Sequence, residues 1–329
     1  MKQPRITRRQ FISIVAATGT ALAVGLPAPD KLKFVSKSRI LMGTRVNLTL
    51  LSRDQENAET AAEACLTEMA GLESILSRHQ PASQLSILNY TGSLDHPHPA
   101  LKEMLTRSRE LSDLTRGAFD ITVKPLLDLY QEAAGSLAPD QIQQALELVN
   151  YQNLILEDTR AYFASPGMSI TLDGIAKGYI VDAGVKLLQL AGYINVLVEA
   201  GGDLTASGGK GRNTPWRIGL QDPRGAMGEI LTRVELRDRS LATSGDYLQK
   251  YTTDLTSHHI LDPRTGFSPP DFSSVSVSAS SAALADGLAT AIMVLGEDGL
   301  GLIESVADCE AYTVSKSGLV RKTAGFLEI

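Results

Sequence analysis

The chain has 329 residues, of which 43% are hydrophobic and 21% are charged, and its formal net charge is −6. A mean hydropathy close to zero is typical of a soluble globular protein and excludes one embedded in the bilayer. Aromatic residues make up only 5% of the chain, and the balance of charge is acidic. We therefore expect no nucleic-acid partner, because such proteins need basic surfaces or stacking platforms.

The first 29 residues differ in composition from the rest. They contain no acidic residue, and their four cations are Lys2, Arg5, Arg8 and Arg9. The arginine pair precedes an apolar run over 13–26 that is too short and too polar for a membrane span. The pattern predicts a twin-arginine export signal over 1–29 and a periplasmic protein, with an ordinary basic N-terminus as the alternative. No cysteine follows the run, so no lipid anchor through cysteine is expected.

Hydrophobic periodicity and turn signals predict the elements of the remaining chain. In order they are paired strands within 34–51, a helix over 54–77, a polar loop over 78–89, helices over 99–115, 122–130 and 139–148, strands over 154–157 and 162–172, a helix over 174–192, strands over 194–198, 216–221, 230–236 and 275–278, a helix over 278–296, and closing strands over 311–314 and 319–322. Strands outnumber helices and several are consecutive. The predicted fold class is therefore α+β, with antiparallel sheets flanked by helices. Residues 30–329 are expected to form one domain or two closely packed subdomains.

The two cysteines, Cys65 and Cys309, fit no metal-ligand spacing. Two buried free thiols are expected, with one disulfide as the alternative.

The helix over 278–296 contains the most informative pair of side chains. Asp286 and Thr290 lie one turn apart in an otherwise small and apolar run, so they project from the same side. A carboxylate and a hydroxyl so placed can share one Mg²⁺, which prefers oxygen ligands and substrate phosphates. A capped or ion-paired aspartate is the alternative reading of the same spacing.

Two earlier segments can bind a ring or a phosphate. In residues 116–122, Gly117 relaxes the backbone and Phe119 offers a flat surface, whereas a turn in which Asp120 caps the next helix is the plainer interpretation. In residues 172–179, a helix starting after Gly174 would present free N–H groups to an anion, and Lys177 would add a charge. A surface lysine is the alternative.

Three later segments are also suggestive. Adjacent glycines in 198–204 allow close approach of a ligand or make a plain turn. Hydroxyls beside a glycine in 241–247 suit a phosphate or a ring edge. His259, just before an apolar pair, can accept a proton, although a lone histidine is commonly only hydrogen-bonded.

Taken together, the segments match a family pattern in order and spacing. The chain resembles the FAD:protein FMN transferases through nine collinear segments. They read ILMGTRVNL, LSRHQPASQLSILN, TRGAFDITVKPL, LDGIAKGYIVD, VEAGGDL, WRIGLQDP, LATSGDY, HHILDPRTG and ADGLATAIMVLG.

The resemblance implies an α+β, T-fold-like protein that holds FAD in a cleft. It implies Mg²⁺-dependent transfer of the FMN half of FAD to a Ser or Thr of a client flavoprotein, with release of AMP. The protein would contact a membrane only through its leader or through a membrane-bound client. The implied catalytic residues are His259 and Asp286, and the implied metal site is Gly174, Asp286 and Thr290. The implied FAD contacts are Met42, His79, Ala118, Phe119, Asp120, Lys177, Thr243, Ser244 and Gly245.

The chain departs from the family pattern at two places. It has Thr171 where the family often has aspartate, and Asp173 where the family has glycine. His79 stands where a tyrosine is common, which affects the expected cover over the flavin ring. A flavin-binding carrier and a Mg²⁺-dependent FAD pyrophosphatase are the alternative functions.

Overall fold

A computed structural model describes residues 32–329 apart from 134–136, 212, 227 and 327. Its framework is an eight-stranded antiparallel sheet with the strand order β1-β2-β6-β7-β10-β11-β12-β13. These strands are β1 (Lys33–Leu41), β2 (Thr44–Ser52), β6 (Val196–Ala200), β7 (Asp203–Ser207), β10 (Arg239–Gly245), β11 (Phe272–Ala279), β12 (Glu310–Ser315) and β13 (Val320–Lys322). Two smaller antiparallel sheets are β3 (Ser93–Asp95), β5 (Arg160–Phe163) and β4 (Leu154–Leu156), and the hairpin β8 (Trp216–Gln221) with β9 (Ile230–Leu236).

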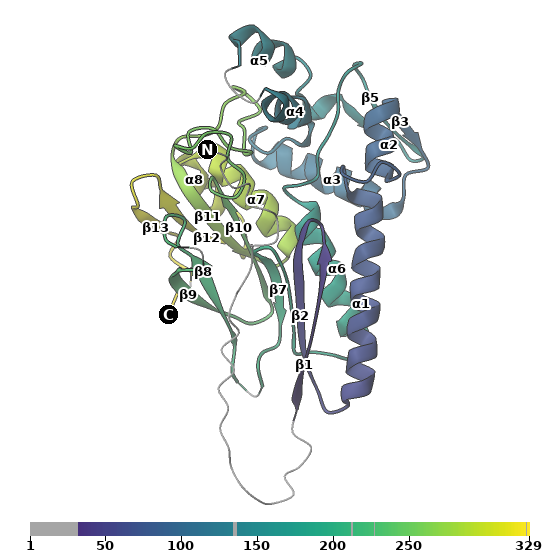
Figure 1. The fold of residues 1–329 in the computed structure, drawn as a ribbon, viewed down its shortest axis with the longest axis vertical. Helices are drawn as coiled ribbons and strands as arrows, with labels where there is room; N and C mark the ends of the chain where they lie inside the picture. Colours follow the sequence, from purple (N-terminus) through teal and green to yellow (C-terminus); the bar gives the residue numbers. More distant parts are fainter. Residues whose placement is uncertain (1–31, 134–136, 212, 227, 327) are drawn as a thin grey trace, which may run out of the picture.

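Four helices cover one face of the large sheet, namely α1 (Gln55–Leu76), α6 (Ala176–Leu190), α7 (Ala282–Leu295) and α8 (Asp298–Glu304). The helices α2 (Gln84–Thr91) and α3 (Pro99–Leu114) pack against α1, and α4 (Lys124–Glu132) and α5 (Pro139–Leu146) form a lobe at one end. Figure 1 shows α1 and α6 side by side next to the β1–β2 hairpin. The main core lies between this layer and the sheet, because alternate strand residues such as Val46, Leu48 and Leu50 point toward it.

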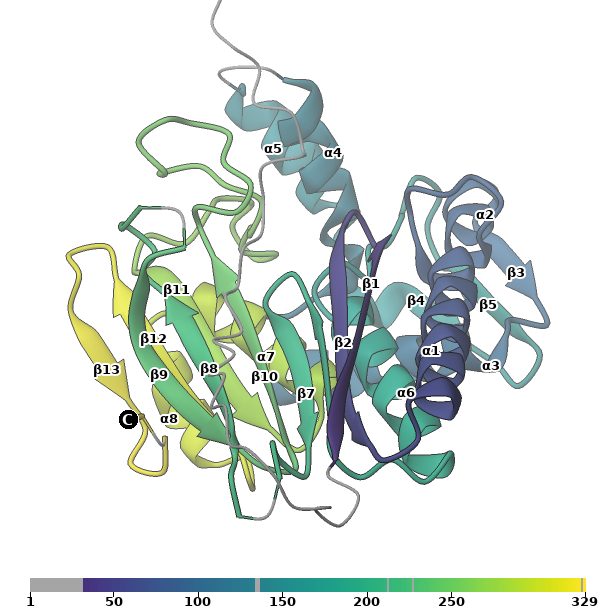
Figure 2. The same ribbon diagram turned by 60° about the horizontal axis from the view of Figure 1, so that its bottom comes forward.

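The β8–β9 hairpin lies across the other face of the sheet. Figure 2 shows it in front of the sheet, with α7 behind. A second apolar cluster holds it there, in which Trp216 and Val234 of the hairpin pack with Leu204 and Leu241 of the sheet. The large sheet is thus covered on both faces in this half, and its strands are buried accordingly.

The α+β class with antiparallel sheets is confirmed, and the longest predicted helix is nearly correct in its bounds. Asp54 caps α1 by accepting a hydrogen bond from the Asn57 N–H, and α1 ends before Ser77. The residues expected on its apolar side are all buried, namely Leu66, Met69, Leu72 and Leu76.

Two expectations about elements are wrong. Residues 78–89 are not all loop, because α2 begins at Gln84 after its Ser83 cap. The strand expected over 162–172 ends at Phe163, and residues 164–175 have only bends, turns and irregular structure. No element was expected over 203–207 or 239–245, where the structure has the strands β7 and β10.

The remaining expectations about bulk organisation have mixed outcomes. Cys65 and Cys309 are buried free thiols, so the disulfide alternative is wrong. The predicted export signal lies outside the described residues. Among the described helices, none combines the length and the apolar character needed to cross a bilayer.

Candidate active site

One cavity of about 2150 Å³ collects nearly all of the predicted site residues. It is lined by the predicted residues Met42, His79, Ala118, Phe119, Asp120, Gly174, Lys177, Thr243, Ser244, His259, Asp286 and Thr290. Gly245 is the exception and does not line it. A side chain at Gly245 would collide with the Tyr247 ring, so this glycine accommodates Tyr247, which does line the cavity.

The end of the cavity at α7 depends on a close helix crossing. Ser281 caps α7, and small residues follow it. At Gly178 a Cβ atom would lie 2.3 Å from the Ala282 carbonyl oxygen, so only glycine lets the start of α6 approach α7 this closely. The Gly178 N–H then donates to the Asp286 carboxylate at 3.3 Å. Asp286 is therefore buried beside the first turn of α6.

Asp286 belongs to a cluster in which carboxylates outnumber cations. Lys177 forms an ion pair with the fully buried Asp203, and Asp286 and Glu199 lie near the same ammonium. Burial, followed by the neighbouring charge of Asp203, raises the pKa of Asp286 well above its ordinary value. Burial by itself would lower the pKa of Lys177, but the carboxylates outweigh it and raise that pKa.

One oxygen atom in this cluster has no partner. The Oδ1 atom of Asp203 is buried without a hydrogen bond within the described residues. A buried polar atom of this kind is costly unless a ligand satisfies it. The cluster therefore favours an added cation.

The three predicted metal ligands, Gly174, Asp286 and Thr290, come together at this end. A Cβ atom at Gly174 would lie 3.1 Å from Thr290 Oγ1 and 3.4 Å from the Phe119 ring, so the Gly174 backbone adjoins both. Thr290 Oγ1 lies 3.2 Å from Ser244 Oγ on β10. Over the described ranges, no three His, Cys, Asp or Glu side chains form a metal-binding group. A cation here would therefore depend on hydroxyl, main-chain and substrate oxygens, as Mg²⁺ commonly does.

The expectation of free N–H groups at the start of α6 is wrong. The Ala176 N–H donates to the Leu172 carbonyl at 2.8 Å, and the Tyr179 N–H donates to the Ile175 carbonyl at 3.1 Å. With the Gly178 N–H bound to Asp286, little of this turn is left for an anion. Lys177 is not a plain surface lysine either, because its ammonium is bound to Asp203.

The predicted flavin contacts line the same cavity, and Phe119 adjoins the Gly174 end. Met42 has a φ of 52° and, with Gly43 at 70°, makes the tight turn between β1 and β2. Phe119 is buried at 4% exposure. Asp120 accepts hydrogen bonds from the Thr122 N–H, the Thr122 hydroxyl and the Tyr151 N–H, so its predicted capping role is confirmed.

The two departures from the family pattern have local explanations. Asp173 accepts a hydrogen bond from Arg78 Nε at 2.6 Å, and its own N–H donates to Thr171 Oγ1 at 3.1 Å. The displaced acid is thus held by an ion pair at the cavity wall. His79, the residue after Arg78, is exposed at the same wall of the cavity.

His259 is oriented by the main chain of Gln249. Its Nδ1 atom lies 3.1 Å from the Gln249 carbonyl oxygen, and its N–H donates to the same oxygen at 2.9 Å. A proton on Nδ1 leaves the lone pair of Nε2 free to accept another. Burial lowers the pKa of His259, which keeps the ring neutral and able to act as a base.

The sequence did not single out Asp203 and Glu199 as individual residues. Both lie on the β6–β7 hairpin around Gly201 and Gly202, within a segment that was read only as a turn or a binding loop. The available signal was two acids flanking a glycine pair after a buried strand. Their relation to Lys177 and Asp286 depends on long-range pairing and could not be read from spacing.

Comparisons with known proteins find relatives along most of the chain. A profile described as the ApbE family matches residues 42–313. An FAD:protein FMN transferase of Vibrio cholerae is 30% identical over 96% of this chain and 95% of its own length. One from Treponema pallidum is 29% identical over 89% and 88%.

Solved structures give the same result. The ApbE protein of Thermotoga maritima has a TM-score of 0.81 at 30% identity, covering 89% of this chain and 97% of its own. The flavinyl transferase ApbE of Pseudomonas stutzeri has a TM-score of 0.75 at 30% identity, covering 89% and 95%.

Proposed function

Because this chain belongs to the ApbE family, we propose that its cavity holds FAD with the diphosphate at the Asp286 end and the flavin near Phe119. The protein is an FAD:protein FMN transferase, and the transfer function expected from the sequence is confirmed. The observation that carries the placement is the meeting of Gly174, Thr290 and Phe119, which joins the predicted metal and flavin residues in one cavity.

The predicted metal site fits Mg²⁺ by its chemistry. Asp286, the Thr290 hydroxyl and the Gly174 carbonyl offer hard oxygen ligands, and the unpartnered Asp203 oxygen adds negative charge nearby. When bound there, Mg²⁺ would neutralise charge on the phosphoryl oxygens of FAD. Lys177 would hold Asp203 in place and add positive charge at the diphosphate.

The transfer itself needs a nucleophile from the client. The hydroxyl oxygen of a client Ser or Thr would attack the phosphorus of the FMN half, and the bond to the AMP half would break. The hydroxyl proton would pass to Nε2 of His259, the nitrogen that Gln249 leaves unprotonated. AMP would leave with the bridging oxygen, and FMN would remain bound to the client through a phosphoester.

The size of the cavity supports a second substrate. Its volume of about 2150 Å³ is roughly twice the upper end of the range for small-ligand sites. Its lining also includes Thr44 and Leu197 of the sheet and Ile218 of the β8–β9 hairpin. A client segment would enter by this part and bring its hydroxyl to the diphosphate.

The proposal is tested by mixing the purified protein with FAD, Mg²⁺ and candidate clients that carry an accessible threonine. We expect AMP in solution and a gain of one FMN on the client by mass spectrometry. AMP without client modification would indicate an FAD pyrophosphatase. Tight retention of FAD without either product would indicate a carrier.

We also propose that residues 1–29 direct export by the twin-arginine route, so that the protein acts in the periplasm. The support is the Arg8–Arg9 pair before the apolar run. A reporter fused after residue 29 should reach the periplasm, and replacing both arginines by lysine should retain it in the cytoplasm. Export that survives this replacement would refute the route.

A further inference from the structure

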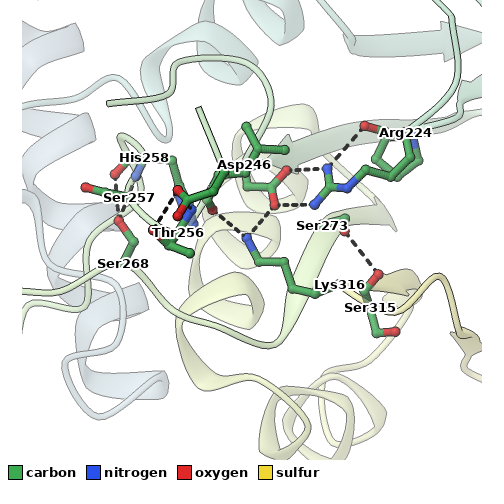
Figure 3. A network of polar contacts seen from close by, with 12 residues as sticks. Arg224, Asp246, Thr256, Ser257, His258, Ser268, Ser273, Ser315 and Lys316 are labelled. Carbon is green, nitrogen blue, oxygen red and sulfur yellow. Dashed lines mark hydrogen bonds and ion pairs between the residues drawn. The ribbon is translucent and has the colours of Figure 1, made fainter. Parts of the chain in front are cut away.

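A second buried charge cluster lies behind the segment that carries His259. We call Arg224, Asp246 and Lys316 the Asp246 cluster (Figure 3). The Asp246 carboxylate is fully buried and accepts two hydrogen bonds from Arg224, at 2.8 and 2.7 Å, and one from Lys316. Burial would raise the pKa of Asp246, but these hydrogen bonds outweigh it and lower that pKa. The carboxylate is thus ionised and fully paired.

The cluster joins three parts of the fold that are far apart in sequence. Arg224 comes from the turn between β8 and β9, Asp246 directly follows β10, and Lys316 follows β12. None of the three lines the cavity. Asp246 is also tied to β11, because its N–H donates to the Ser273 carbonyl at 3.0 Å.

Lys316 reaches further than Asp246 alone. Its ammonium also donates to the Leu255 carbonyl at 3.0 Å, which lies in the segment 247–260. The same segment contains the Gln249 carbonyl that orients His259. Its other side is closed by Ser268, which accepts from the His258 N–H and donates to the His258 carbonyl, both at 2.9 Å.

We propose that Lys316 and Asp246 are positioning residues for the reaction, because together they hold segment 247–260 so that His259 faces the FAD cavity. The inference rests on the proposed function for the role of His259. Within the described residues, the side chains of the cluster are hydrogen-bonded to segment 247–260 through Lys316, so its loss should release the segment while Arg224 still pairs with Asp246.

The first experiment requires no substrate. Amide hydrogen exchange of the full chain should show faster exchange at the His259 N–H in Lys316→Met, by about tenfold or more, because a segment released from Lys316 opens more often and exposes the hydrogen bond from His259 to Gln249. Lys316→Arg should restore protection. Lys322→Met is the matched control, since Lys322 on β13 is exposed and pairs only with Glu328 among the described residues. Unchanged exchange in Lys316→Met would overturn the proposal.

The second experiment identifies the residue through which Lys316 acts. With FAD and a client that the wild type modifies, Lys316→Met should lower kcat about tenfold or more and leave KM for FAD within about twofold. In a His259→Ala background the same change should have no further effect on kcat. Additive effects, or a loss confined to KM, would refute positioning through His259.

The two failures can be told apart. A wild type that yields no AMP with any client refutes the proposed function, and the exchange experiment still decides whether Lys316 holds the segment. Arg224→Met is a second variant in case Lys316→Met fails to fold. It leaves Lys316 bound to Leu255, so the His259 N–H should keep its protection, and a loss of protection would contradict the inference.

Discussion

The two buried charge clusters on either side of His259 have opposite balances of charge. Around Lys177, three carboxylates share one ammonium, and one oxygen of Asp203 has no partner in the described structure. Around Asp246, two cations share one carboxylate, and both carboxylate oxygens are bonded. Each cluster contains an aspartate with no exposed surface, so burial alone does not distinguish them.

The difference indicates which cluster is prepared for a ligand. A cluster with surplus negative charge becomes more stable when a cation enters, whereas a carboxylate that already pairs with two cations needs no further partner. We therefore assign the Lys177 cluster to substrate chemistry and the Asp246 cluster to the placement of a loop. A substitution in the Lys177 cluster should consequently change activity with little change in stability, whereas one in the Asp246 cluster should lower stability as well as activity.

The largest effect is expected on activity from Asp286→Ala. Loss of the carboxylate should lower the rate of AMP release by at least about a thousandfold, because it removes a metal ligand together with its negative charge. The free energy of unfolding should stay within about 1 kcal/mol, since repulsion from Asp203 is relieved. Asp298→Ala, at an exposed position of α8, is the control. Substantial activity in Asp286→Ala would remove this residue from the metal site.

In the other cluster, Asp246→Ala should lower stability strongly, in addition to the loss of activity expected from a positioning residue. Two cations would be left facing each other in a site where the carboxylate was fully buried, and such losses cost about 3–5 kcal/mol. Urea unfolding measures this change. Glu297→Ala, which breaks the exposed pair with Arg321, should cost less than about 1 kcal/mol. Equal losses in the two variants would contradict the contrast between the clusters.

A smaller effect is expected on the pH dependence of stability, and it arises from His258. Its ring is fully buried with no hydrogen bond from either nitrogen in the described structure, and burial lowers its pKa to about 4. Lys316 and His259 lower this pKa further, while Asp246 opposes them. Between the unfolded value of about 6.5 and about 4, the unfolded chain binds a proton that the folded chain does not.

The contribution of His258 to the free energy of unfolding is therefore largest above about pH 6.5, and it falls as the pH is lowered. The loss should reach about 2 kcal/mol at about pH 5. His258→Gln should show a correspondingly smaller difference between pH 7 and pH 5 in urea unfolding. His96→Gln, at an exposed position, should keep the full difference. A His258→Gln variant with the wild-type dependence on pH would assign the effect to another group.

The smallest effect concerns the flavin end of the cavity. Replacing the exposed His79 by tyrosine, the residue common in the family, should add ring contact worth about 0.5–1.5 kcal/mol. FAD should then bind about two- to twelvefold more tightly, as measured by quenching of flavin fluorescence. Weaker binding would mean that position 79 does not cover the ring.

Sequence reasoning succeeded where structure is determined locally. The helix α1 has an aspartate cap and a regular apolar side, and both can be recognised in the amino-acid sequence. The pairing of Asp286 with Thr290 follows from helical spacing alone. Nine collinear segments then supplied the family, which no single segment could have done.

It failed where distant partners decide the outcome. Strands β7 and β10 were not predicted, because they contain polar residues on their helix-facing side. In the structure Thr205 and Ser240 bond each other across the sheet at 2.8 Å. Lys177 looked free to bind a phosphate because its partner Asp203 lies on another element. The free N–H groups at the start of α6 were likewise lost to acceptors that spacing cannot reveal.

The central claim is that a divalent cation completes the acid-rich cluster beside bound FAD. The most direct measurement is anomalous scattering from a crystal of the full chain grown with FAD and Mn²⁺ in place of Mg²⁺. The account predicts a peak within coordination distance of the Asp286 carboxylate, the Thr290 hydroxyl and a phosphate oxygen of FAD. A crystal with FAD bound but no peak there, and with Lys177 paired to Asp286 instead, would contradict it.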